Sequence, residues 1–121
     1  MTQEDKELLL KDLCARLPYE VKVNVIYSNE HASSLRQRVC VEGDNELNTD
    51  IIGLYQRNEI DIKPYLFPLS SMTEEERIAI GNEFAYGHPH KAMDILHQRH
   101  IDYRGLIEKG LALDATGLNI Y

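Results

Sequence analysis

The stretch that decides the fold is Ile60–Glu76, IDIKPYLFPLSSMTEEE, because the character of the chain changes across it. Apolar and polar residues alternate at its start, as in a β-strand with one buried face. Pro64 and Pro68 then interrupt this pattern, since proline has no backbone N–H to donate to a sheet. Thr73 followed by Glu76 is a capping box, which begins a helix. The sequence therefore predicts mainly strands before this stretch and mainly helices after it.

An N-terminal helix is predicted to begin at Thr2 and to end before Pro18. Thr2 is the expected N-cap, with Asp5 completing a capping box. The residue that precedes a proline is disfavoured in the α region, so Pro18 ends the helix. Four leucines recur at the spacing of one helix face, and we expect this stripe to cover a sheet: Leu9, Leu10, Leu13 and Leu17.

Four strands are predicted in the strand-rich part of the chain, residues 20–66. Valines alternate with polar residues in the first strand, and Pro64 confines the last strand to an edge or an end. Short connections favour an antiparallel meander or a small barrel. The turn between the second and third strands is predicted at Gly43-Asp44-Asn45, and Gly53 is a candidate bulge in the third. The four predicted strands are Glu20–Ser28, Leu35–Glu42, Leu47–Tyr55 and Ile60–Leu66.

Helices are predicted in residues 73–113. Thr73 caps the first of them, and Gly87 suits its C-terminal end because glycine adopts a positive φ at low cost. Pro89 fits the first turn of the next helix. Leu106–Leu113 is either a short helix or a loop that returns to the sheet. The predicted fold is thus one α+β domain over residues 1–121, with an N-terminal helix, a three- or four-stranded antiparallel sheet or small barrel, and two or three C-terminal helices.

Composition narrows the class of function. The 121 residues carry a net charge of -7, and no cluster of Lys and Arg resembles the surface that contacts phosphates in nucleic-acid-binding proteins. No apolar stretch approaches the ~20 residues of a membrane span, and the first residues lack the features of a signal peptide. Cys14 and Cys40 have no metal-binding spacing. We expect a cytoplasmic protein with reduced thiols and no cofactor, which contacts neither nucleic acid nor membrane.

Histidine is the one residue type with an uneven distribution. Four of the five histidines fall between residues 88 and 100: His88, His90, His97 and His100. His97 and His100 are three residues apart, so on a helix they would share a face. Imidazoles are common ligands of Zn²⁺, and the cluster is therefore a candidate metal site, although its spacing matches no established zinc signature.

The second candidate site is the segment between the two prolines, Tyr65, Leu66 and Phe67. On an extended chain Tyr65 and Phe67 point to one side and Leu66 to the other. One of these sides is either covered by the C-terminal helices or exposed as an apolar contact patch for a partner. No nucleophile elbow, phosphate-binding loop or other catalytic motif occurs in the sequence, so we assign no catalytic residue.

Three blocks of the sequence carry a family resemblance: DLCARLPY at Asp12–Tyr19, IKPYLFPLSSMTEEE at Ile62–Glu76 and DYRGLIEKGLAL at Asp102–Leu113. They resemble a family of small uncharacterised proteins encoded by gut Bacteroidales and by their phages and integrated elements. Glu20 stands where that pattern has Gly, and Phe67 where it has a basic residue. The resemblance implies a small accessory protein of mobile-element origin, and it implies no activity and no catalytic residues.

The sequence and the resemblance together favour a non-enzymatic binding or interaction module, for example an anti-defence factor of a phage. A protein partner or self-association is expected before a small molecule. The alternative is a small enzyme or metal-binding protein that uses the histidines between His88 and His100.

Overall fold

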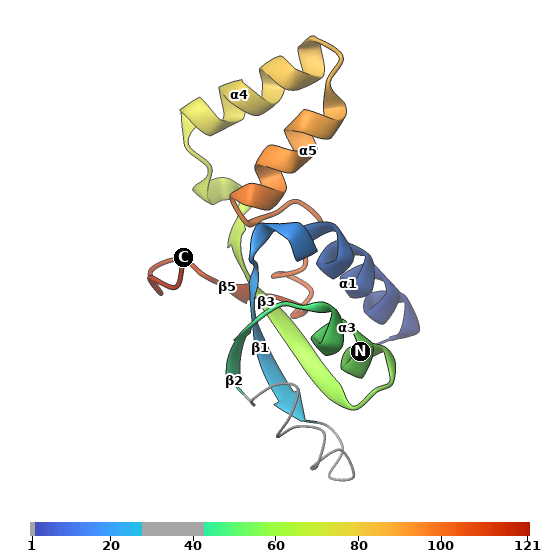
Figure 1. Ribbon diagram of the computed structural model, residues 1–121. Helices are drawn as coiled ribbons and strands as arrows, with labels where there is room; N and C mark the ends of the chain where they lie inside the picture. Colours follow the sequence, from blue (N-terminus) through green and yellow to red (C-terminus); the bar gives the residue numbers. More distant parts are fainter. Residues whose placement is uncertain (1, 28–42) are drawn as a thin grey trace. The chain divides into compact units, whose positions relative to one another are not determined.

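The computed structural model describes residues 2–27 and 43–121, and within them the chain forms four α-helices and five β-strands (Figure 1). The α+β class expected from the sequence is confirmed. The described residues form two compact units, Met1–Tyr65 and Leu66–Tyr121, whose boundary falls inside one strand. The assignment of a single domain stays a prediction. None of the helices in the described part has the length and apolar character needed to cross a bilayer.

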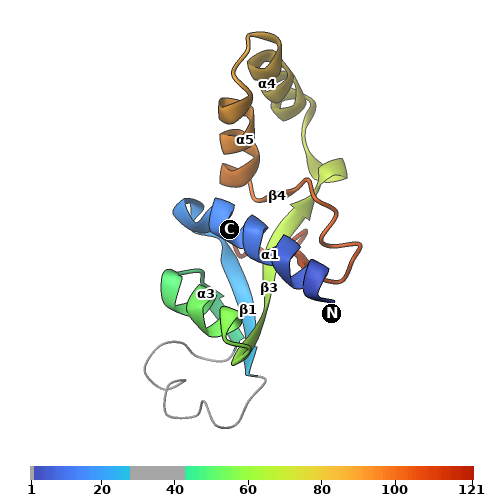
Figure 2. The ribbon, with the colours of Figure 1, turned by 90° about the vertical axis from the view of Figure 1, so that its right-hand side faces the viewer.

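The first unit has helices on one side of a small antiparallel sheet. Strand β1 (Lys22–Tyr27) lies between β2 (Gly43–Glu46) and the first part of β3 (Ile60–Pro68). Helices α1 (Gln3–Arg16) and α3 (Thr49–Gln56) lie on the same side of β1 and β3 (Figure 2). A short 3₁₀ helix, Leu17–Tyr19, follows α1. Pro64 pairs with Val23 of β1, but β3 lies between β1 and β4 in the strand order, so the prediction that this strand lies at an edge or an end is wrong.

The predicted N-terminal helix is confirmed in detail. The Thr2 side chain accepts a hydrogen bond from the Asp5 N–H, and the Asp5 carboxylate accepts one from the Thr2 N–H. Leu9 and Leu13 are fully buried, whereas Leu10 and Leu17 are half-buried. The core of this unit joins these two leucines to Val21, to valines of β1 and to isoleucines of α3 and β3: Val23, Val25, Ile51, Ile60 and Ile62.

The predicted third strand, Leu47–Tyr55, is wrong, because residues 49–56 form helix α3. Its Ile, Leu and Thr content is typical of strands, but Asn48 starts a helix: its side-chain oxygen accepts a hydrogen bond from the Ile51 N–H at 2.9 Å. Gly53 is therefore helical and not a bulge.

The predicted turn at Gly43-Asp44-Asn45 is also wrong, since these residues belong to β2. The predicted strand Leu35–Glu42 lies outside the described residues, as does Cys40, while Cys14 is an exposed free thiol.

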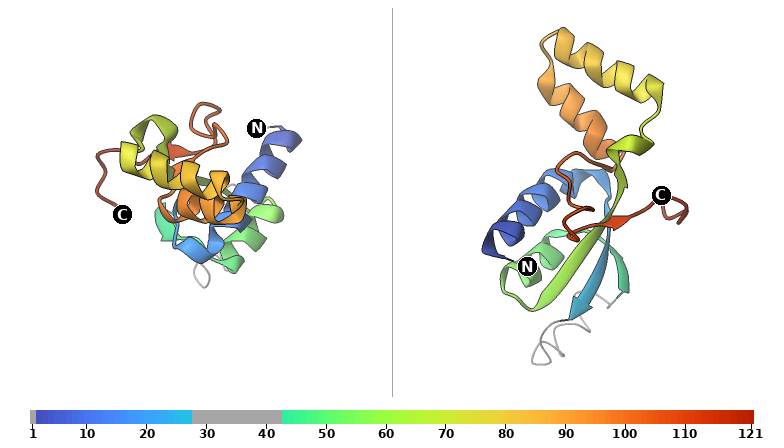
Figure 3. Two further views of the ribbon diagram at one scale, coloured as in Figure 1. Left: turned by 90° about the horizontal axis from the view of Figure 1, so that it is seen from above. Right: turned by 180° about the vertical axis from the view of Figure 1, so that it is seen from behind.

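The second unit contains a helical hairpin and three short strand segments. Helices α4 (Glu74–Ala85) and α5 (Pro89–Gln98) pack against each other (Figure 3). The end of β3 pairs with β4 (Ile101–Asp102), and β5 (Leu113–Asp114) also pairs with β3. The predicted Thr73–Glu76 capping box, the positive φ of Gly87 and the position of Pro89 at the start of α5 are confirmed.

The sheet is mixed, which corrects the expected antiparallel meander. Phe67 pairs with Ile101, and Pro68 with Asp102, in a parallel ladder. The α4–α5 hairpin makes this possible, because a parallel pair needs a long crossover connection. Leu106–Leu113 contains turns and no helix, so of the two alternatives the loop that returns to the sheet is correct. The Ala115 N–H donates to the Leu66 carbonyl at 2.8 Å just after β5.

Candidate functional site

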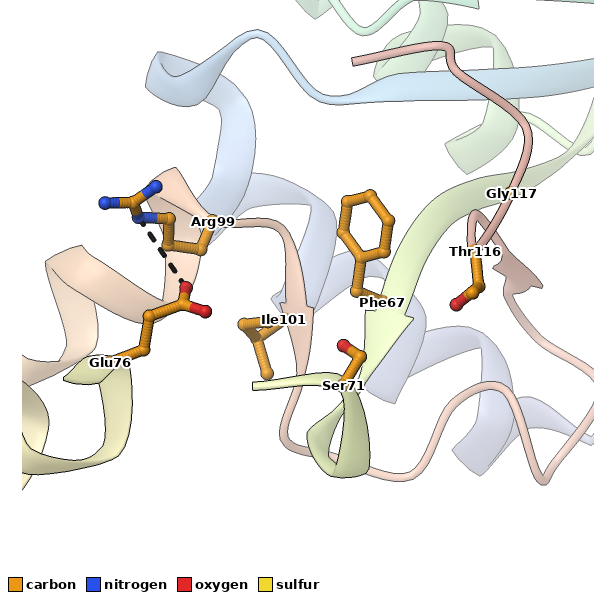
Figure 4. A pocket seen from close by; sticks show the side chains of 7 residues that line it. All are labelled: Phe67, Ser71, Glu76, Arg99, Ile101, Thr116 and Gly117. Carbon is orange, nitrogen blue, oxygen red and sulfur yellow. Dashed lines mark ion pairs between the residues drawn. The ribbon is translucent and has the colours of Figure 1, made fainter. Parts of the chain in front are cut away.

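The second unit contains a pocket of about 370 Å³ at the point where β3, β4 and the C-terminal segment meet. Figure 4 shows the side chains that line it. Two apolar side chains form its centre, an ion pair stands on one side, and two small residues of the C-terminal segment stand on the other. The lining residues are Phe67, Ser71, Glu76, Arg99, Ile101, Thr116 and Gly117.

Strand pairing holds the apolar centre in place. Phe67 and Ile101 are register partners in the parallel β3–β4 ladder, and the Phe67 N–H donates to the His100 carbonyl at 2.8 Å. Ser71 follows in the short 3₁₀ helix Leu69–Ser71, where its hydroxyl donates to the Pro68 carbonyl at 2.6 Å. The hydroxyl proton of Ser71 is therefore engaged within its own turn. The Phe67 ring is half-buried and reaches the pocket.

The charged side of the pocket is an ion pair between α4 and the end of α5. The Arg99 guanidinium lies 3.7 Å from the Glu76 carboxylate, with 65% of the Arg99 side chain exposed and 21% of that of Glu76. The other Glu76 oxygen accepts a hydrogen bond from the Thr73 N–H at 3.0 Å. An exposed pair at this distance contributes at most ~1 kcal/mol. Arg99 can therefore leave Glu76 for a better partner at small cost.

An aromatic side chain from the C-terminal segment lies beside the pocket. The Tyr121 ring is tilted against Phe67, with ring centroids 5.9 Å apart, and is stacked on His100 at 3.9 Å. Offset or tilted aromatic pairs of this kind contribute ~0.5–1.5 kcal/mol beyond the area they bury. The residues after β5 are thereby tied to β3 and β4 by Tyr121 as well as by the Ala115 hydrogen bond.

Of the predicted contact patch Tyr65, Leu66 and Phe67, only Phe67 lines this pocket. Leu66 is fully buried and belongs to the core. The Tyr65 hydroxyl donates to the Asp44 carboxylate at 2.6 Å. This hydrogen bond raises the pKa of Tyr65 and, together with one from Asn24, lowers the pKa of Asp44. The three residues of the predicted patch therefore have different environments. Leu66 is in the core, Tyr65 is in a polar hydrogen-bond network, and Phe67 lines the pocket.

The four clustered histidines do not converge. The His88 and His90 rings lie edge to face with centroids 6.1 Å apart, while His97 contacts Tyr103 and His100 contacts Tyr121. The expectation that His97 and His100 share a helix face is wrong, because α5 ends at Gln98 and His100 has a φ of 58°. Within residues 2–27 and 43–121, no three His, Cys, Asp or Glu side chains are placed to hold a metal ion.

A short hydrogen-bonded chain accounts for His97. The Arg104 guanidinium donates to the Tyr103 hydroxyl at 3.1 Å, and that hydroxyl lies 2.7 Å from His97 Nε2. A hydroxyl group can both donate and accept, so Tyr103 joins Arg104 and His97 in one hydrogen-bonded chain. His97 is buried, and we interpret this chain as a link between α5 and the segment after β4.

Sequence reasoning missed three buried charged side chains, two of which form an ion pair. The Arg16 guanidinium and the Asp12 carboxylate form an ion pair of 2.7 Å with both side chains fully buried. The spacing i, i+4 on one helix was the available signal. The Asp102 carboxylate, also buried, accepts hydrogen bonds from the Leu106 and Ile107 N–H groups at 3.0 and 2.9 Å. All three side chains hold local structure, and all three fall in blocks that carry the family resemblance.

Comparisons of the chain with family models, with curated proteins and with solved structures found no match. The assignment of a site therefore rests on the geometry of the described residues.

Proposed function

We propose that this protein is a non-enzymatic binding module that takes an apolar side chain of a protein partner into the pocket beside Phe67. The observation that carries the proposal is the make-up of the pocket: an apolar centre of Phe67 and Ile101 next to an exposed arginine. Partner-binding pockets commonly combine a mostly apolar surface with a few polar groups that fix orientation.

The pocket is large enough to take a side chain of a protein segment. Ligand sites typically enclose about 300–1,000 Å³. The pocket beside Phe67, at about 370 Å³, is near the lower limit and has room for one or two side chains of a peptide. The charge of Arg99 favours an acidic residue next to the apolar one, because a carboxylate of the partner can replace the long contact to Glu76.

The polar groups of the pocket support binding rather than catalysis. Ser71 donates its proton to a carbonyl in its own turn, and Glu76 caps α4 and pairs with Arg99. A nucleophile needs a neighbouring base, and a general acid or base needs a free proton-transfer path. Each of these side chains has a structural role that competes with such chemistry.

The family resemblance adds a biological setting to the proposal. It suggests an accessory protein of a phage or mobile element that acts in the cytoplasm, of which an anti-defence factor is one form. Such a protein would act by occupying a surface of a host or phage protein, and the pocket beside Phe67 is the contact we propose for it.

Selection of peptides from a random display library tests the binding site. We expect peptides selected on the unaltered protein to share one apolar or aromatic residue beside an acidic residue. Phe67→Asp should lose these peptides, and Arg99→Glu should select basic neighbours in place of acidic ones. Ile26→Asp, at an exposed residue of β1, is the matched control and should keep the original peptides.

Two results would contradict the proposal. One is a selection that yields no shared pattern on the unaltered protein. The other is binding of the selected peptides to Phe67→Asp as strong as to the control, with both variants shown to be folded by their melting curves.

A further inference from the structure

The segment after β5, residues 116–121, lies beside the pocket and supplies part of its wall. Two of its residues line the pocket. The Thr116 N–H donates to the Asp114 carboxylate at 2.9 Å, and the Leu118 N–H donates to the Ala115 carbonyl at 3.1 Å. Five of the six residues are exposed. Exposure and hydrogen bonds of short range are features of segments that open at small cost while the rest of the fold stays intact.

Two residues with a positive φ turn this segment back towards β3 and β4. Gly117 has a φ of 79° and Asn119 has a φ of 53°. Glycine adopts such angles without a steric cost, and asparagine tolerates them better than most residues do. The turn therefore brings the Tyr121 ring onto the strands with little strain. Its centroid lies 3.9 Å from that of His100 and 5.9 Å from that of Phe67.

Tyr121 covers part of an aromatic surface that belongs to the pocket. Phe67 lines the pocket, and the same ring lies against Tyr121. The planes of the Tyr121 and His100 rings are nearly parallel, with an angle of 17° between them, and 43% of Tyr121 is exposed. Removal of the Tyr121 ring would therefore extend the pocket across Phe67 to the face of His100.

We propose that Tyr121 occupies the place of an aromatic residue of the partner, and that binding displaces the segment 116–121 from Phe67 and His100. This inference rests on the proposed function of the pocket. An aromatic side chain of the partner can make both ring contacts that Tyr121 gives up, whereas an aliphatic side chain cannot replace the stack on His100. Closure by Tyr121 reduces the apparent affinity for the partner in proportion to the fraction of molecules that are open.

Proton NMR tests the closed position without any ligand. Protons that lie over an aromatic ring resonate upfield, so the His100 ring protons of the unaltered protein should lie upfield of those of Tyr121→Ala. Tyr121→Phe keeps a ring at this position and should keep the shift. His100→Asn assigns the signal, since asparagine suits the φ of 58° at that position. Equal His100 shifts in the unaltered protein and in Tyr121→Ala would overturn the proposal.

Peptide binding tests the displacement. The probes are the peptides selected by display on the unaltered protein, and their shared apolar residue should be Phe, Tyr or Trp. Tyr121→Ala should bind them about three- to tenfold more tightly, because no ring of the chain itself competes with the peptide. Tyr121→Phe is the matched control and should bind them as the unaltered protein does.

The outcomes separate a failure of the displacement from a failure of the pocket. Equal or weaker binding to Tyr121→Ala, or a shared residue that is aliphatic, would overturn the displacement while the pocket stands. Peptides that bind Phe67→Asp as strongly as the unaltered protein, or a selection without a shared pattern on both the unaltered protein and Tyr121→Ala, would overturn the pocket and the displacement with it.

Discussion

The ion pair of Asp12 and Arg16 is the residue-scale feature with the largest expected effect on stability. Both side chains are fully buried in α1. Removal of one member leaves a buried charge without its main counter-ion, which costs ~3–5 kcal/mol. Asp12→Ala should therefore lower the free energy of unfolding by that amount in urea denaturation. The double variant Asp12→Leu/Arg16→Met should recover most of the loss, because it leaves no buried charge; a double variant as unstable as the single one would contradict this account.

The Tyr55 hydroxyl provides a residue-scale prediction for pH. Burial, together with the nearby carboxylates of Asp61 and Asp5, raises the pKa of Tyr55 to about 12. The folded protein therefore holds this proton more tightly than the unfolded chain, so its contribution to stability is complete below pH ~10 and is lost as the pH rises to about 12. Absorbance titration should resolve one tyrosine of the seven that ionises near pH 12, and Tyr55→Phe should remove it. Titration of all seven near pH 10 would show that Tyr55 is accessible.

At the scale of elements, the start of α4 depends on its capping box. Thr73 Oγ1 accepts from the Glu76 N–H at 3.1 Å, so Thr73→Ala should cost ~1 kcal/mol of unfolding free energy. Thermal denaturation measures the loss, and Ser70→Ala at an exposed position before the helix is the control. Equal melting temperatures for the two variants would mean that the helix does not depend on this cap.

The packing of α1 gives the second prediction at this scale. Leu13 is fully buried, and Leu13→Asp should unfold the first unit because a carboxylate would enter the core without a partner. Cys14→Asp places the same group one residue later on the exposed side and should leave the fold intact. Circular dichroism compares them. A folded Leu13→Asp variant would show that α1 is peripheral.

The elements differ in how well the sequence predicts them, and the reasons are local. Helices α1, α4 and α5 were predicted because each has a clear start signal in the sequence. These signals are the N-caps Thr2 and Thr73 and the first-turn proline Pro89. Helix α3 has only eight residues, too few for its period to be distinguished from that of a strand, and Asn48 was its only signal. Strand β4 has two residues and exists because the α4–α5 hairpin returns the chain to Phe67. That return is a property of the fold and leaves no pattern in the sequence.

At the scale of the whole molecule, the candidate site could be predicted only in part, because folding brings together residues that are far apart in the sequence. Phe67 was named from its place between two prolines, but Arg99, Ile101, Thr116 and Gly117 come from later segments of the chain. Nothing in their spacing indicates a common pocket. The histidines show the opposite case: they are close in sequence, yet strand β4 and the positive φ of His100 separate them into different contacts.

The most direct test of the central claim is photo-crosslinking from position 67 in the native host. A photoreactive phenylalanine analogue replaces Phe67 in one variant and the exposed Ile26 in a control variant. We expect a discrete protein adduct from position 67, lost when Arg99→Glu is added, and no such adduct from position 26. Absence of an adduct at position 67, or the same adduct from both positions, would contradict a binding role for this pocket.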